Sequence, residues 1–192
     1  MTRDELEHII RAAAAISGED EIVVVGSQSI LGQFPDAPAE LCVSNEADVY
    51  PKNDPEGADV IDGSIGELSP FHDTFGYYAQ GVGPRTAVLP DGWEERLVRV
   101  HGPATRGATG LCLEVHDLVV SKYVANREKD RRFVQVAIRH GLISREILVE
   151  RLAVTEMDPV IRRHVAALVA ADFVSNGQPS SAKKAAEGEP PR

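Results

Sequence analysis

The sequence predicts an α+β (α/β) fold, in which a mixed β-sheet with helices is followed by a C-terminal helical bundle. Two observations support this. Short β-branched or alternating segments separated by Gly and Pro fill residues 20–115. From Asp117 onward, apolar residues recur with the roughly 3.6-residue period of amphipathic helices.

The front half opens with an amphipathic helix predicted over 4–16, which Ser17-Gly18 ends. A helix is also predicted over 28–34, and Asp54-Pro55 opens another that reaches about residue 66. A loop is expected at 102–110. Five strands are predicted from apolar or alternating segments: 21–25, 41–50, 75–82, 96–101 and 111–115.

In the back half, helices are predicted over 117–127, 129–140, 144–153 and 158–173. The last residues are polar and rich in Pro, Gly, Ala and Ser, which is typical of a disordered tail. We therefore expect three parts, listed as an α/β core (1–116), a helical region (117–175) and a tail (176–192).

No apolar run approaches the ~20 residues that a transmembrane helix needs. The N-terminal segment MTRDELEHII lacks the basic start and apolar run of a signal peptide. We therefore expect a cytoplasmic protein with no membrane partner.

The net charge of −10 argues against a general nucleic-acid binder, but the charge is unevenly distributed. Residues 1–95 contain four Lys or Arg and 19 Asp or Glu, whereas residues 96–139 contain nine and four. A local basic surface on an acidic protein suits an anionic ligand such as a nucleotide or an RNA end. A solvated helix with i,i+4 charge pairs would produce the same pattern.

Cys42 and Cys112 each have apolar neighbours, which suits buried thiols that behave as small hydrophobic side chains. A disulfide between them stays open as an alternative. Two isolated cysteines and dispersed histidines lack the spacing of a zinc site.

A Gly-Ser turn follows the first predicted strand, in Val24-Val25-Gly26-Ser27. Glycine allows a ligand to approach the backbone closely, and serine adds a hydroxyl beside backbone N–H donors. The pair can cradle phosphate. A plain strand-ending turn is the alternative.

Glu46 and Asp48 lie two residues apart on the second predicted strand. Residues i and i+2 of a strand share a face and lie roughly 6.6 Å apart at Cα, so the two carboxylates project together. Paired carboxylates on a rigid strand suit a Mg²⁺ ion whose other ligands are substrate phosphates. The alternative is the solvent-facing side of an edge strand.

Lys122 lies on the apolar stripe of the first back-half helix rather than opposite it. Either the lysine snorkels to solvent, or it is held in a cleft wall to meet phosphate. Lys129 and Asp130 follow one heptad later. In the loop at 102–110, Arg106 is a candidate for contacting a triphosphate or an acceptor, with a plain loop as the alternative.

Together these motifs resemble the nucleotidyltransferase fold of the DNA polymerase beta superfamily. The superfamily pattern is a hydrophobic strand ending in Gly-Ser or Gly-Gly, a spacer, and then two acidic residues two positions apart. Ser44-x-Glu46-x-Asp48 is similar to its Thr-x-Asp-x-Asp motif. Downstream, the spacing of Lys122, Arg127, Lys129 and Asp130 resembles the signature of AbiEii- and MenT-type toxin nucleotidyltransferases.

The resemblance implies a Mg²⁺- or Mn²⁺-dependent transfer of an NMP from an NTP to a hydroxyl acceptor. Glu46 and Asp48 would hold the metal, with Glu114 as the candidate third carboxylate and Asp130 as its alternative. Gly26 and Ser27 would cradle phosphates. The implied cations around the nucleotide are Lys122, Arg127, Lys129 and Arg106, with Lys122 and Asp130 also expected to act in catalysis.

The favoured acceptor by resemblance is a tRNA 3′ end, and the protein would act as the toxin of a toxin–antitoxin system with an antitoxin partner. Two other readings stay open. One is a catalytically lapsed protein that binds a nucleotide or a partner, and the other is a transferase acting on a protein or a small molecule.

Overall fold

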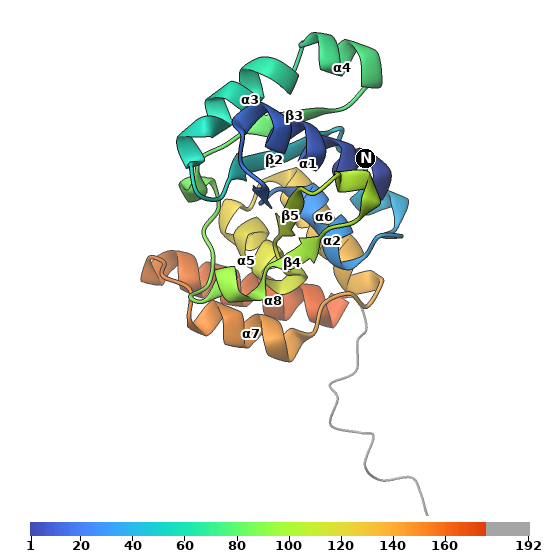
Figure 1. Cartoon of the computed structure of the whole chain (residues 1–192). Helices are drawn as coiled ribbons and strands as arrows, with labels where there is room; N and C mark the ends of the chain where they lie inside the picture. The colour runs from blue at the N-terminus through green and yellow to red at the C-terminus, as the bar shows by residue number, and fades with distance from the viewer. Residues whose placement is uncertain (176–192) are drawn as a thin grey trace, which may run out of the picture.

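A computed structural model describes residues 1–175, and the predicted tail at 176–192 lies outside the described residues (Figure 1). The centre of the fold is a five-stranded sheet with the order β3-β2-β1-β5-β4. The strands are β1 (Glu21–Val24), β2 (Glu46–Pro51), β3 (Tyr78–Gly81), β4 (Val98–Val100) and β5 (Thr109–Cys112). β1 pairs parallel with β5 and antiparallel with β2, whereas β3 pairs parallel with β2 and β4 antiparallel with β5. The predicted mixed sheet is confirmed.

Helices cover the sheet on both sides (Figure 1). The front-half helices are α1 (Arg3–Ser17), α2 (Ile30–Gln33), α3 (Ala58–Ile65) and α4 (Pro70–Phe75). The back half supplies α5 (Val115–Ala125), α6 (Glu128–Arg139), α7 (Arg145–Ala153) and α8 (Pro159–Ser175). α5 contacts α6, α7 and α8, so it forms the centre of the helical region.

The alternation along β2 decides which face of the sheet carries polar groups. Ala47 and Val49 are fully buried, whereas Glu46 and Asp48, which alternate with them along the strand, are partly exposed. The sheet face opposite the two carboxylates packs on α1. There, a Cβ added to Gly110 would lie 2.4 Å from Cδ1 of Ile10, so a larger residue would require the Ile10 side chain to move. The helix α1 therefore leaves the carboxylate face free for a site.

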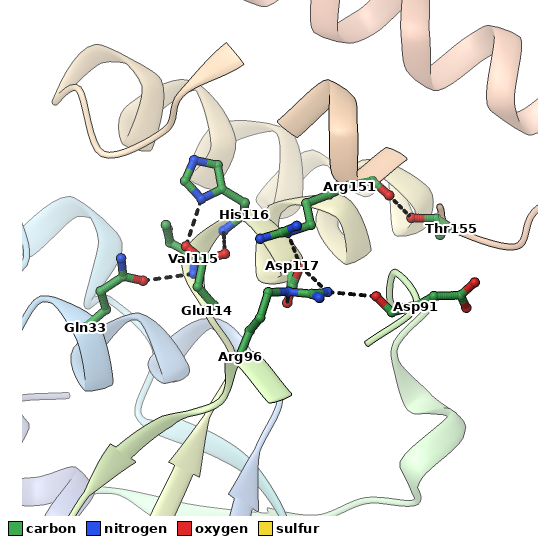
Figure 2. A network of polar contacts seen from close by, with 9 residues as sticks. All are labelled: Gln33, Asp91, Arg96, Glu114, Val115, His116, Asp117, Arg151 and Thr155. Carbon is green, nitrogen blue, oxygen red and sulfur yellow. Dashed lines mark hydrogen bonds and ion pairs between the residues drawn. The ribbon is translucent and has the colours of Figure 1, made fainter. Parts of the chain in front are cut away.

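A fully buried carboxylate anchors the N-terminal end of α5 (Figure 2). Asp117 accepts hydrogen bonds from Nε and Nη2 of Arg96 at 2.8 and 3.1 Å, and Nε of Arg151 lies 3.3 Å from Oδ1. Arg96 also donates to the backbone carbonyl of Asp91 at 3.1 Å. Burial raises the pKa of Asp117 and the two arginines oppose this rise. The network ties the β4 side of the sheet to α5 and α7.

Glu114 corrects one prediction, because it does not lie on a strand. β5 ends at Cys112, and Glu114 is the N-cap of α5, where its carboxylate accepts from the backbone N–H of His116 at 2.9 Å. Nδ1 of His116 lies 2.8 Å from the same carboxylate (Figure 2). Nε2 of His116 accepts a hydrogen bond from the Ser144 N–H at 2.9 Å. Glu114 thus serves to link α5 with the start of α7.

The starts of two predicted strands also need correction. The second strand starts at Glu46 rather than residue 41, since residues 39–41 form a 3₁₀ turn. The third strand starts at Tyr78, because the preceding residues form α4, which was not predicted. Its signals are a Ser69 N-cap and Pro70 at the first helical position. Both cysteines are free thiols, and only Cys112 is fully buried.

Replacing Asp117 by Asn is expected to lower the free energy of unfolding by about 3–5 kcal/mol, because two arginines would lose the charge that compensates them in a buried site. For a chain of this length, this corresponds to a melting temperature roughly 10 °C lower. Thermal unfolding followed by circular dichroism measures the shift. The matched control is Arg99→Gln, which breaks an exposed ion pair with Glu21 and should cost less than about 1 kcal/mol. Equal shifts in the two variants would contradict this account.

Candidate functional site

A cavity of about 780 Å³ lies where the ends of β1 and β2 meet α5 and α6. Eight of the ten predicted site residues line it: Gly26, Ser27, Glu46, Asp48, Lys122, Arg127, Lys129 and Asp130. Glu114 and Arg106 are not among the lining residues. Arg106 lies in the exposed turn before β5, with a left-handed backbone (φ 51°).

The Gly-Ser turn and the carboxylate pair are in direct contact. A Cβ added to Gly26 would lie 1.6 Å from Oδ2 of Asp48, so any side chain at position 26 must displace that carboxylate. The backbone of Gly26 has an ordinary φ of −81°. Glycine is therefore required here for space, because the Asp48 carboxylate packs directly on the backbone that follows β1.

The two carboxylates on β2 disfavour each other's negative charge. Burial raises the pKa of Asp48 to about 6, and the neighbouring Glu46 adds to the rise. The positive charges of Lys122 and Lys129 partly offset it. Near neutral pH Asp48 is therefore largely ionised at an electrostatic cost, which a bound cation would relieve.

Neighbouring hydroxyl groups hold Glu46 at the start of β2. The hydroxyl of Tyr78 on β3 donates to Oε2 of Glu46 at 3.1 Å. Oγ of Ser44 accepts from the backbone N–H of Glu46 at 3.1 Å and donates to its carbonyl at 3.3 Å. Ser44, which occupies the first position of the Ser-x-Glu-x-Asp motif, thus fixes the backbone where the strand begins.

Lys122 does not snorkel, because its side chain is 8% exposed and its ammonium group is held inside the cavity wall. Nζ donates to Oγ of Ser27 at 2.8 Å and to Oδ1 of Asp130 at 3.0 Å. It also lies 5.4 Å from the centre of the Phe133 ring, within range of a cation–π interaction. The lysine thus joins α5 to the Gly-Ser turn and to α6.

Asp130 is fully buried and is the counter-ion of two cations. Besides Lys122, Nε of Arg127 donates to its Oδ2 at 2.6 Å. Burial alone would raise the pKa of Asp130, but the hydrogen bond from Arg127 and the charge of Lys122 outweigh it and lower that pKa. Its carboxylate is therefore ionised and committed to positioning Lys122 and Arg127.

Within the described part of the chain, no third acidic residue completes a metal-binding group with Glu46 and Asp48. Among residues 1–175, no group of three or more His, Cys, Asp or Glu is arranged to hold a metal ion. Two carboxylates are nevertheless a sufficient protein contribution for Mg²⁺, which commonly takes its remaining ligands from water and substrate phosphates.

The mouth of the cavity combines exposed cations with aliphatic side chains. Lys129 and Arg132 line it, are exposed, and have no hydrogen-bond or ion-pair partner within residues 1–175. Val43 and Val88 line it as well and are 77% and 39% exposed. No sequence motif marks these valines, Tyr78 or Phe133, because each joins the site only through tertiary contacts.

Asp48→Asn is expected to stabilise the metal-free protein at pH 7.5 but not at pH 4. Since the folded pKa is about 6, against 3.8 for an ordinary Asp, ionising Asp48 costs free energy that accumulates as the pH rises from about 4 to about 6. Stability contributed by the protonated form is lost over that window. We expect the melting temperature of the variant to exceed that of wild type by a few degrees at pH 7.5. Equal differences at both pH values would contradict the assignment.

One family of known proteins matches this chain over the residues that form the site. The model of a family described as a nucleotidyltransferase of unknown function (DUF6036) matches residues 4–173. Neither the curated proteins nor the solved structures gave a match. The matched residues run from α1 into α8 and include every residue lining the cavity. The chain therefore belongs to this nucleotidyltransferase family.

Proposed function

We propose that the protein is a Mg²⁺-dependent nucleotidyltransferase that moves an NMP from an NTP to a hydroxyl acceptor. The main observation in favour of this function is that one cavity contains both the Glu46–Asp48 pair and the Lys122–Ser27 hydrogen bond. Phosphoryl transfer depends mainly on positioning and on neutralising charge, and these groups supply both.

Glu46 and Asp48 would hold the metal, and their chemistry fits it. Both offer hard carboxylate oxygens, and the raised pKa of Asp48 reflects an electrostatic cost that a divalent cation would remove. Mn²⁺ meets the same requirement. When bound, the metal supplies charge neutralisation and polarisation of a phosphoryl oxygen.

The triphosphate would lie between the Gly-Ser turn and the cations of α5 and α6. Ser27 already receives a hydrogen bond from Lys122, so its own O–H is free to donate to a phosphate oxygen. Lys122 would neutralise charge developing on the departing pyrophosphate. Arg127, whose side chain is 61% exposed, would contact the outer phosphates.

A tRNA 3′ end is the acceptor that we propose, which would make the protein a growth-inhibiting toxin controlled by an antitoxin. The motif resemblance supports this, and so does the position of Lys129 and Arg132 at the cavity mouth. These two cations can neutralise the phosphates of a strand whose end enters the cavity.

The function is tested by transfer of α-³²P label from each of the four NTPs to total tRNA in the presence of Mg²⁺. Label is expected in tRNA with the wild-type protein and from a preferred NTP. The double variant Glu46→Ala/Asp48→Ala should transfer none while retaining its folded state in thermal unfolding.

Two results would contradict parts of the proposal. Mg²⁺-dependent nucleotide binding without label in tRNA would exclude this acceptor, and the assay would then be repeated with a protein mixture and with small molecules. Absence of transfer to every acceptor would favour a catalytically lapsed binder, a reading that the missing third carboxylate also raises.

Replacing both Lys129 and Arg132 by Gln is expected to raise the KM for tRNA about tenfold at ~0.1 M salt. The slope of log KM against log salt should also fall by about 1.5, because two fewer phosphate contacts release counterions. Steady-state kinetics at several salt concentrations measure both effects.

The matched control is Arg106→Gln/Arg163→Gln, which removes two exposed arginines. Neither side chain has a hydrogen-bond or ion-pair partner within residues 1–175, and neither lines the cavity. This variant has the same net charge as the test variant. Equal salt slopes in the two variants would mean that the mouth does not contact the RNA backbone.

A further inference from the structure

We propose that Tyr78 is a positioning residue that orients Glu46 for metal binding. The inference rests on the proposed function, because it concerns how one of the two carboxylates is held. Neither the motifs nor the family resemblance points to this tyrosine, and its role follows from the pairing of two strands.

The register of β2 and β3 places Tyr78 directly beside Glu46. The two strands are parallel, and Glu46 pairs with Tyr78 while Asp48 pairs with Gln80. Directly paired residues project from the same face of a sheet. The phenol hydroxyl therefore reaches Oε2 of Glu46, to which it donates a hydrogen bond at 3.1 Å.

The ring of Tyr78 is itself supported from α4. The ring centre lies 4.6 Å from that of His72, and the two planes are inclined by 49°. Nδ1 of His72 accepts from the backbone N–H of Leu68 at 3.1 Å, which fixes the imidazole orientation. The backbone N–H of His72 donates to the Ser69 N-cap. The short helix α4 thus supports the ring of Tyr78, whose hydroxyl orients the Glu46 carboxylate.

The hydroxyl of Tyr78 is a permanent donor. A phenol has an ordinary pKa of about 10, so it keeps its proton and can donate throughout the physiological range. A donor on Oε2 restricts rotation of the carboxylate and leaves Oε1 for a cation. Hydrogen bonds of this kind to metal ligands are typically worth 10- to 100-fold in metal affinity.

Gln80, which pairs with Asp48, does not contact Asp48 in the way that Tyr78 contacts Glu46. Its amide nitrogen donates to Oδ1 of Asp62 on α3 at 2.7 Å, so it is directed toward another carboxylate. Asp48 instead rests on Gly26. Of the two carboxylates, Glu46 is therefore the one that depends on β3 for its orientation.

The test is Mn²⁺ binding to the full-length protein, measured from the free-ion electron paramagnetic resonance signal, with wild type, Tyr78→Phe and Tyr77→Phe. Tyr78→Phe keeps the ring against His72 and removes only the hydroxyl. We expect its Mn²⁺ affinity to fall about tenfold. Activity should recover at saturating Mn²⁺, so that the metal concentration for half-maximal rate changes and kcat does not.

The matched control is the adjacent tyrosine. The hydroxyl of Tyr77 contacts Nδ1 of His8 on α1 at 2.7 Å, away from the carboxylates. Tyr77→Phe removes a comparable, partly buried contact of a tyrosine hydroxyl and should leave Mn²⁺ affinity unchanged. Thermal unfolding of both variants confirms that each is folded at the assay temperature.

The outcomes separate this inference from the proposed function. Wild-type protein that binds Mn²⁺ no better than Glu46→Ala would overturn the proposed metal site itself. Wild-type protein that binds Mn²⁺ better than Glu46→Ala, but with the same affinity as Tyr78→Phe, would overturn the positioning role alone. A loss of affinity shared by Tyr77→Phe would also overturn it, by tracing the effect to general destabilisation.

Discussion

The buried ammonium group of Lys122 is the constraint on which the arrangement of the site depends. A lysine that is 8% exposed needs compensation, and it receives it from the carboxylate of Asp130 and the hydroxyl of Ser27. These partners belong to α6 and to the turn after β1. Satisfying one charge therefore fixes α5, α6 and the Gly-Ser turn relative to one another, and that junction forms the cavity wall.

The opposite wall carries the complementary charge. Glu46 and Asp48 share the free face of β2, and Gly26 leaves room for the Asp48 carboxylate where any larger residue would not. The cavity thus contains an acidic side and a basic side, joined through the same strand end. A metal–triphosphate complex presents a cation to the first and anionic oxygens to the second, which is why we propose it as the ligand.

The sequence predicted the parts of this site that depend on local pattern. Alternation placed Glu46 and Asp48 on one face of a strand, and helical periodicity placed Lys122 on the buried stripe of α5. These are consequences of the backbone repeat, so they survive without knowledge of the tertiary structure. The fold class follows from the same signals, summed over the chain.

What the sequence did not predict depends on long-range packing. Tyr78 joins Glu46 through the register of β2 and β3, which no local pattern specifies. Glu114 was expected on a strand, but β5 ends two residues earlier and the residue caps α5 instead. Asp130 was a candidate metal ligand, yet its burial between Lys122 and Arg127 makes it a counter-ion.

The proposed function requires the Gly26–Asp48 contact and Lys122 to form one metal- and nucleotide-binding site. Isothermal titration calorimetry of non-hydrolysable NTP analogues, with and without Mg²⁺, tests it most directly when wild type is compared with Gly26→Ala. The account predicts Mg²⁺-dependent binding to wild type and its loss in the variant, because the added Cβ displaces the Asp48 carboxylate without removing a charge. Binding that is independent of Mg²⁺, or equal in the two proteins, would contradict it.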